Sequence, residues 1–278
     1  MKKLLSLAAI TLIVASCEKP ATIPAYLSID QYTFNAGNGN GTSSNAITDA
    51  WLTINGEFKG AYEIPFEVPI LEEGIVSIKV EPGIKMNGIS STRIVYPFYT
   101  DFDFEADLNA DSTLQVNPTA TYNSLGTFEW MEDFEDAGYT LEHTNKSDSV
   151  FVLVNDSNAF EGNSIAFYMD TARNFFEGVS SNEFELPTTV GSNIFLEMDY
   201  KCDNPFTVGI FANTPGGVSQ EQILRVNRSE EWNKIYVNLT PNVVSNFNAN
   251  AFKVFFGAIL ENPDSAAVYI DNLKLIYL

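Results

Sequence analysis

The chain is poor in the side chains that build most catalytic and metal sites. Its 278 residues include only two cysteines and one histidine. Zinc sites need clusters of such residues, so zinc is not expected. The single histidine, His143, lies in the polar segment Glu142-His-Thr-Asn-Lys-Ser-Asp148 and predicts no catalytic triad. In Leu196-Glu-Met-Asp-Tyr-Lys-Cys202, alternation of apolar and polar residues places Cys202 on an apolar face, as a buried thiol.

Basic residues are also scarce. Lysine and arginine total 15 against 36 aspartates and glutamates, which leaves a formal net charge of −21. Nucleic acid is excluded as a partner, because its binding needs clustered basic side chains that replace counterions. Anionic lipid surfaces would repel the body of the protein. The charge is compatible with solubility and with divalent cations.

The amino terminus carries the pattern of a secretory signal. Lys2 and Lys3 precede an apolar stretch from Leu4 to Val14, and small residues precede Cys17. The apolar stretch is too short to span a bilayer, which takes about 20 residues. An ordinary signal with an incidental cysteine would share most of this pattern.

Val14-Ala-Ser-Cys17 resembles the lipobox of bacterial lipoproteins. The resemblance implies removal of residues 1–16, acylation of Cys17 (a palmitate-type modification) and anchoring in the outer membrane. Several acyl chains together make a lasting anchor. With Cys17 acylated, no disulfide remains, and residues 17–25 form a short tether. Lipoproteins of the Bacteroidota use acidic residues after this cysteine for surface display, but Glu18 is followed by Lys19, so the choice between cell surface and periplasmic face stays open.

Residues 26–120 are expected to form short strands. Asn55-Gly56 between Trp51–Ile54 and Glu57–Tyr62 predicts a hairpin, because this dipeptide tolerates positive φ at both turn positions. Pro65 and Pro69 predict an edge strand. From Thr100 to Asp107, apolar and acidic residues alternate, which predicts a strand with one solvated acidic face.

This portion resembles the small immunoglobulin-like or carboxypeptidase-regulatory-like sandwiches of Bacteroidota lipoproteins, which implies a structural or spacer module. The residues that carry the resemblance are Ile47-Thr-Asp-Ala-Trp51, Ile54-Asn-Gly56, Pro69-Ile-Leu-Glu-Glu-Gly74, Pro82-Gly-Ile84 and Tyr96-Pro-Phe-Tyr99.

A second domain, residues 121–278, is expected to be an all-β sandwich, because short apolar strands recur about every ten residues with turn residues between them. The predicted strands are Phe151–Val154, Ser164–Tyr168, Phe195–Cys202, Phe206–Ala212, Ile223–Asn227, Ile235–Leu239, Phe252–Leu260 and Val268–Tyr277. Thr171 to Asn182 is read as a loop, in which Phe175-Phe176 forms either an apolar tip for a partner or a folded-under plug.

The order of landmarks in this domain resembles the galactose-binding-like jelly rolls of carbohydrate-binding modules. The matching segments are Asp133-Phe-Glu-Asp136, Phe160-Glu-Gly-Asn-Ser164, Trp232-Asn-Lys-Ile-Tyr-Val-Asn-Leu239 and Val268-Tyr-Ile-Asp-Asn-Leu273. The resemblance implies a jelly-roll fold, and it implies little about function, because this sandwich also serves purely structural roles.

No cofactor is expected to be required, but the jelly-roll resemblance implies a structural calcium ion. Its ligands would be Glu135 and Asp271, with Glu161 as a further oxygen donor. Acidic residues are frequent in this chain, so the same placement also arises by chance.

An enzyme is not expected. Glu197-Met-Asp199 begins like the Glu-x-Asp-x-x-Glu strand of laminarinase-like jelly-roll enzymes, but Cys202 stands where the acid/base glutamate would be. We expect a non-enzymatic outer-membrane lipoprotein that acts as an accessory or scaffold and binds a membrane-protein partner or cell-envelope material. The alternative is a surface glycan-binding lipoprotein of a polysaccharide uptake system.

For the alternative, a glycan site on the concave sheet is predicted from strand alternation. An aromatic platform and planar hydrogen-bonding groups would be supplied by Lys201, Phe211, Arg225 and Asn227.

Modification of the protein itself is a further expectation. Exported Bacteroidota proteins that this chain resembles are O-glycosylated at Asp-Ser/Thr followed by a small or aliphatic residue. That pattern occurs at Ser112, Ser149, Thr171 and Ser265.

Overall fold

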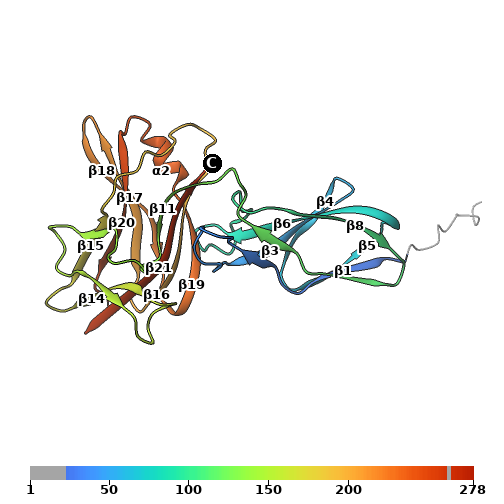
Figure 1. Ribbon diagram of the computed structural model, residues 1–278, viewed down its shortest axis with the longest axis horizontal. Helices are drawn as coiled ribbons and strands as arrows, with labels where there is room; N and C mark the ends of the chain where they lie inside the picture. The colour runs from blue at the N-terminus through green and yellow to red at the C-terminus, as the bar shows by residue number, and fades with distance from the viewer. Residues whose placement is uncertain (1–22, 262–263) are drawn as a thin grey trace, which may run out of the picture.

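The computed structural model describes residues 23–261 and 264–278. The predicted signal, Cys17 and most of the tether lie outside these residues. The described chain consists of strands and one short helix, α2 (Thr240–Ser245), which confirms the prediction of an all-β fold. No helix in the described ranges is both long and apolar enough to cross a membrane. Strands β1 to β10 form three sheets and β11 to β21 form two more, and these two groups lie end to end in Figure 1.

The first group, here called the N-terminal unit, packs around one apolar core. Its sheets have the orders β5-β1-β9, β10-β2 and β4-β3-β6-β7, with β8 also paired to β6. The strands are β1 (Ala25–Ile29), β2 (Thr33–Asn35), β3 (Ile47–Ile54), β4 (Glu57–Glu63), β5 (Phe66–Ile70), β6 (Gly74–Lys85), β7 (Arg93–Val95), β8 (Phe102–Leu108), β9 (Thr113–Val116) and β10 (Thr119–Thr121).

Three local predictions in this unit are confirmed. β3 and β4 pair around a turn in which Asn55 and Gly56 both have positive φ, at 52° and 80°. β5, which follows Pro65, is an edge strand. In β8, Phe102 and Phe104 pair opposite the buried Val80 and Ile78, so the carboxylates of the strand face solvent.

The second group is a jelly-roll sandwich of two antiparallel sheets around the larger core. The inner sheet has the order β13-β14-β21-β16-β19, with β11 also paired to β21, and the outer sheet has the order β12-β15-β20-β17-β18. The strands are β11 (Thr127–Glu132), β12 (Leu141–His143), β13 (Phe151–Val154), β14 (Ser164–Asp170), β15 (Phe175–Ser180), β16 (Ile194–Cys202), β17 (Phe206–Thr214), β18 (Gly217–Val226), β19 (Ser229–Asn238), β20 (Ala251–Ile259) and β21 (Ser265–Tyr277).

Every strand predicted for this part is present, and Cys202 is buried in the core with Leu196, Met198 and Tyr200. The reading of residues 171–182 as a loop is wrong, because Phe175 and Phe176 begin strand β15. Phe176 is fully buried and stacks on Phe167 with 3.7 Å between ring centroids. It is therefore a core residue and not an exposed tip.

The inner sheet is covered on its second face by the N-terminal unit. Phe195, Tyr236 and Ile276 point away from the jelly-roll core and belong to the core of the N-terminal unit. The rings of Tyr96 and Tyr236 have centroids 4.6 Å apart, and the backbone nitrogen of Asn87 donates to the carbonyl of Tyr236 at 2.9 Å. The outer sheet is thus left as the solvent-facing side of the jelly roll, at the end remote from β1 and β5 (Figure 1).

Candidate functional site

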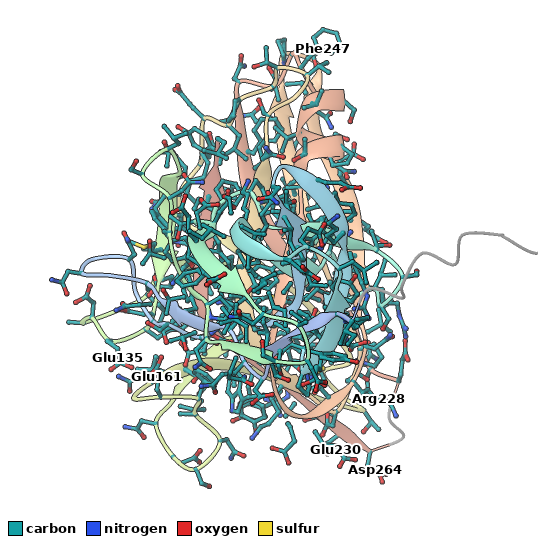
Figure 2. The ribbon with its side chains drawn as sticks, turned by 90° about the vertical axis from the view of Figure 1, so that its right-hand side faces the viewer. Glu135, Glu161, Arg228, Glu230, Phe247 and Asp264 are labelled. Atoms are coloured by element: carbon teal, nitrogen blue, oxygen red, sulfur yellow. The ribbon has the colours of Figure 1, made fainter. Side chains whose placement is uncertain are left out.

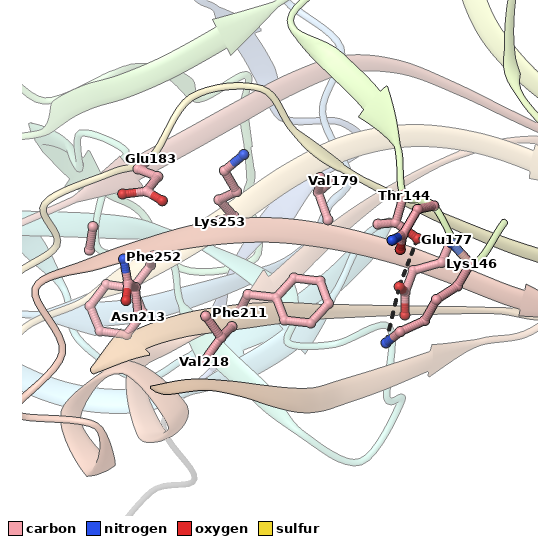
Figure 3. Close-up of a pocket in the computed structure, with 12 residues that line it drawn as sticks. Thr144, Lys146, Glu177, Val179, Glu183, Phe211, Asn213, Val218, Phe252 and Lys253 are labelled. Carbon is pink, nitrogen blue, oxygen red and sulfur yellow. Dashed lines mark hydrogen bonds and ion pairs between the residues drawn. The ribbon is translucent and has the colours of Figure 1, made fainter. Parts of the chain in front are cut away.

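Two adjoining hollows lie on the solvent side of the outer sheet. The first has a volume of about 270 Å³, and Figure 3 shows Phe211 on its floor with Lys253 and Glu177 beside it. The second has a volume of about 260 Å³, and it shares Lys146 and Glu177 with the first. We call the two hollows together the groove. It extends along β17 from Asn213 to Thr207, about 20 Å at the usual rise per residue of a strand.

Strand alternation places the groove residues on this face. In β17 the side chains of Val208, Ile210 and Ala212 enter the core, so those of Thr207, Phe211 and Asn213 face outward. The same period puts Lys253 and Phe255 of β20 beside them in register, because Phe211 pairs with Lys253 and Gly209 with Phe255. The Phe211 and Phe255 rings lie 5.2 Å apart between centroids.

Glu177 is the central polar residue of the groove. Its side chain is only 5% exposed, and it accepts a hydrogen bond from the Thr144 hydroxyl at 2.9 Å. The side-chain amide of Gln220 donates to the other carboxylate oxygen, also at 2.9 Å, and Lys146 lies 3.7 Å away as an ion pair. These partners compensate the desolvation of a buried carboxylate.

The groove therefore combines an aromatic floor with amide, ammonium and carboxylate groups. This is the combination that a sugar requires, because its C–H face packs on an aromatic ring while its hydroxyls exchange hydrogen bonds with planar polar groups. A wider hollow of about 520 Å³ lies between the loop at residues 37–41 and β21, and the lining that the structure describes for it contains no aromatic side chain.

The four residues predicted for a glycan site do not form one patch. Phe211 lies in the groove. Arg225 is on the edge strand β18 of the same sheet, where it forms an ion pair with Glu261 at 2.6 Å. Lys201 lies on the inner sheet, with its ammonium 5.0 Å from the centre of the Tyr269 ring. Asn227 follows β18, and its backbone carbonyl accepts from the Cys202 thiol.

Sequence reasoning missed most of the groove. Glu177 was not identified, because Phe175-Phe-Glu-Gly-Val-Ser180 does not alternate between apolar and polar residues and so gives no clear strand signal. Lys253 and Phe255 lie on a strand that was predicted. Which groove residues they lie beside depends on the register between β20 and β17. The residue pattern of one strand does not contain this register.

The three residues predicted to bind calcium do not gather around one point. Within residues 23–261 and 264–278, no group of three or more His, Cys, Asp or Glu side chains could hold a metal ion. Asp271 is fully buried and accepts from the Ser164 hydroxyl at 2.6 Å, and burial raises its pKa to about 7. Glu135 and Glu161 are exposed, as Figure 2 shows, and Glu135 accepts from the backbone nitrogen of Asn163. In this arrangement Ser164 holds Asp271 and Asn163 holds Glu135, so the three carboxylates form no ready calcium cage and the ion stays a prediction from the resemblance.

The carboxylates that resembled the start of a glycosidase motif face away from the groove. Glu197 and Asp199 are fully buried where β16 meets the N-terminal unit. The hydroxyls of Tyr96 and Tyr122 donate to Glu197, each at 2.8 Å, and burial raises the pKa of Asp199. Side chains enclosed in this way serve the junction between the two units and do not reach a substrate in the groove.

The predicted modification sites differ in accessibility. Ser112, Thr171 and Ser265 are exposed. Ser149 is buried, and its hydroxyl donates to the carbonyl of Tyr168 at 2.6 Å. The structure therefore contradicts the expectation at Ser149, because a folded chain does not offer this hydroxyl to a modifying enzyme.

Comparison with known proteins yields distant matches only. No protein-family model matches the chain, and no curated protein matches it. Among solved structures, the C-terminal family 22 carbohydrate-binding module of Clostridium thermocellum Xyn10B is 14% identical, with a TM-score of 0.38, over 53% of this chain and 92% of that one. The CBM22-1 xylan-binding domain of Paenibacillus barcinonensis Xyn10C is 10% identical, with a TM-score of 0.40, over 54% and 94%.

The family 11 carbohydrate-binding module of Clostridium thermocellum, solved with a β-1,3-1,4-mixed-linked tetrasaccharide, is 14% identical with a TM-score of 0.38, over 52% of this chain and 94% of that one. Similarity at this level does not establish which ligand this chain binds.

Proposed function

We propose that the protein binds a neutral glycan chain in the groove of the outer sheet. The observation that carries the proposal is that Phe211, Glu177 and Lys253 together line the first of two adjoining hollows on a solvent-facing sheet. Side chains of both charge signs line these hollows and supply hydrogen-bond donors as well as acceptors. Such a lining suits neutral hydroxyl groups better than a ligand that carries a net charge. This is the second of the two functions expected from the sequence.

The shape of the groove also favours a chain over a single sugar. A hollow at each end of an approximately 20 Å path along the strands offers contacts to several linked residues. Binding in such an open groove relies on packing against the aromatic floor and on hydrogen bonds from positioned side chains, and it requires no chemical step.

The proposal is tested with a glycan array and calorimetry on the full chain, followed by Phe211→Ala. Loss of the aromatic floor should weaken binding at least about tenfold, which corresponds to about 1.4 kcal/mol. Phe247→Ala is the matched control, because this ring is 75% exposed after α2 and lines neither hollow, and its loss should leave affinity unchanged. A blank array with folded protein, or equal effects of both variants, would refute the proposal and leave a protein partner as the function to pursue.

We further propose that Cys17 anchors the protein to the outer membrane through lipid. The described chain begins at the end of the N-terminal unit that is remote from the outer sheet, so an anchor there would leave the groove facing away from the membrane (Figure 1). Mass spectrometry of the mature amino terminus and fractionation of a Cys17→Ser variant test the anchor. A membrane-bound Cys17→Ser protein would contradict it.

A further inference from the structure

A polar bridge crosses the groove between its two hollows. The side-chain amide of Gln220, on β18, donates to a carboxylate oxygen of Glu177, on β15, at 2.9 Å. These two strands are not neighbours, because β17 and β20 lie between them in the outer sheet. The contact therefore passes over two strands and divides what would otherwise be one continuous groove.

The strand register shows which residue lies beneath the bridge. Gln220 pairs with Phe211 on β17, and Glu177 pairs with Gly257 on β20. A line between the two side chains therefore passes over the pair formed by Gly209 and Phe255, which lies midway along both strands. Phe255 points out of the sandwich core but is only 1% exposed, so it is covered on the solvent side, and we infer from the register that the bridge supplies part of this cover.

The backbone beneath Phe255 lets its ring lie along the sheet. Gly209 stands directly opposite on β17, and a Cβ atom there would collide with the ring edge of Phe255. On the other side, a Cβ atom at Gly257 would be 3.5 Å from the ring. The ring therefore occupies the space of the side chain that is absent at Gly209, whereas a Cβ atom at Gly257 would be at ordinary contact distance from it.

We propose that Phe255 is the central stacking platform of the groove and that a bound sugar displaces the bridge between Gln220 and Glu177 to reach it. This inference rests on the proposed function, and it names the sugar ring at the middle of the glycan chain as the ligand of this subsite. Displacement joins the two hollows into one path. It also gives the ligand access to the Phe255 ring, whose centroid lies 5.2 Å from that of Phe211.

The bridge is suited to exchange for a ligand. Gln220 is an exposed residue on an edge strand, whereas Glu177 keeps Thr144 and Lys146 as partners when the amide leaves. A sugar hydroxyl donates to the released carboxylate oxygen, and the freed amide of Gln220 turns to water from its exposed position. Each polar group that the sugar separates thus gains a new hydrogen-bond partner, so the exchange costs little free energy.

The binding arm of the test uses xylohexaose, cellohexaose and laminarihexaose with the full chain. Phe255→Leu keeps an apolar side chain but removes the ring. For whichever hexasaccharide binds the unmodified chain, this variant should lower the affinity at least about tenfold. Gln220→Ala should strengthen binding about threefold or more, because one hydrogen bond no longer has to be broken. Gln222→Ala, a neighbouring amide on the same strand outside the bridge, is the control and should not strengthen binding.

A second arm needs no glycan. In the full chain carrying Cys17→Ser and Phe255→Cys, the only other thiol is the buried Cys202. Labelling of the new thiol by a maleimide should be slow, and it should become at least about fivefold faster when Gln220→Ala is added but not when Gln222→Ala is added. Circular dichroism and thermal unfolding verify that each variant is folded.

The outcomes separate the two proposals. If a hexasaccharide binds but Phe255→Leu binds it as well as the unmodified chain does, the subsite is refuted and the glycan function stands. Equal labelling rates with and without Gln220→Ala refute the bridge as the cover of Phe255, whatever the binding result. If no hexasaccharide binds the unmodified folded chain or Gln220→Ala, both the subsite and the glycan function fail.

Discussion

The junction between the two units yields a prediction about stability. Tyr96 belongs to the N-terminal unit and is fully buried, and its hydroxyl donates to Glu197 of the jelly roll at 2.8 Å. Tyr96→Phe removes this hydroxyl while keeping the ring contacts, and it leaves one oxygen of a buried carboxylate without its donor. Hydrogen bonds to charged groups contribute about 1.5–3 kcal/mol, so we expect the free energy of unfolding to fall by about 2–3 kcal/mol.

For a chain of this size, each kcal/mol lowers the melting temperature by about 2–4 °C, so the expected fall is roughly 5–10 °C. Urea unfolding and calorimetry at neutral pH measure both quantities. Tyr139→Phe is the matched control, because Tyr139 is 37% exposed and donates to the carbonyl of Phe151 at 3.3 Å. Its loss should cost less than about 1 kcal/mol.

A second donor makes the test more specific. Tyr122 donates to the other oxygen of Glu197 at 2.8 Å. Because both hydroxyls serve one carboxylate, the effects of Tyr96→Phe and Tyr122→Phe should differ from additivity by more than about 0.5 kcal/mol. A loss below about 0.5 kcal/mol for Tyr96→Phe, or a loss confined to one of two resolved unfolding transitions, would refute the idea that Glu197 couples the units.

Three further predictions concern single positions. Burial lowers the pKa of Lys274 to about 8, so the unfolded chain binds more protons between about pH 8 and 10.5. The native chain should gain about 2–3 kcal/mol relative to Lys274→Met from pH 7 to pH 10 in urea unfolding, and a constant difference would contradict this. Gly209→Ala should destabilise by about 1–3 kcal/mol, because its Cβ meets the Phe255 ring and the backbone of β18; a neutral effect in thermal unfolding would be inconsistent with that contact. Burial raises the pKa of the Cys202 thiol to about 11, so this thiol should resist alkylation near pH 8 until the chain is unfolded, and rapid labelling of the native protein would show that the site is open.

Much of the local structure could be predicted from the sequence, because it depends on neighbours in the chain. The β3–β4 hairpin follows from Asn55-Gly56, whose residues adopt positive φ at little cost. The alternation in β8 packs the half-buried phenylalanines against the core and leaves the carboxylates in water. The all-β class followed from the same short-range patterns repeated along the chain.

Strand β15 shows where the alternation of apolar and polar residues fails to predict a strand. Its residues are buried at five successive positions from Phe176 to Ser180, because β15 lies between β12 and β20 and its outward-facing Glu177 is covered by Thr144 and Gln220. Such a strand lacks a solvated face, so the period-two signal weakens and the turn residues around it dominate the reading. Because the strand was not predicted, Glu177 was not identified as a candidate site residue.

The sequence by itself determined the short-range geometry: turns, alternation, an acidic surface and the apolar burial of Cys202. Only the tertiary structure decided which faces meet. It brought Glu177 and Gln220 together across two intervening strands, and it enclosed Glu197 between Tyr96 and Tyr122 of the other unit. The physical reason is that strand register and sheet packing join residues separated by 43 to 101 positions. The free energy of such contacts depends on burial and partners, which no local pattern of residues contains.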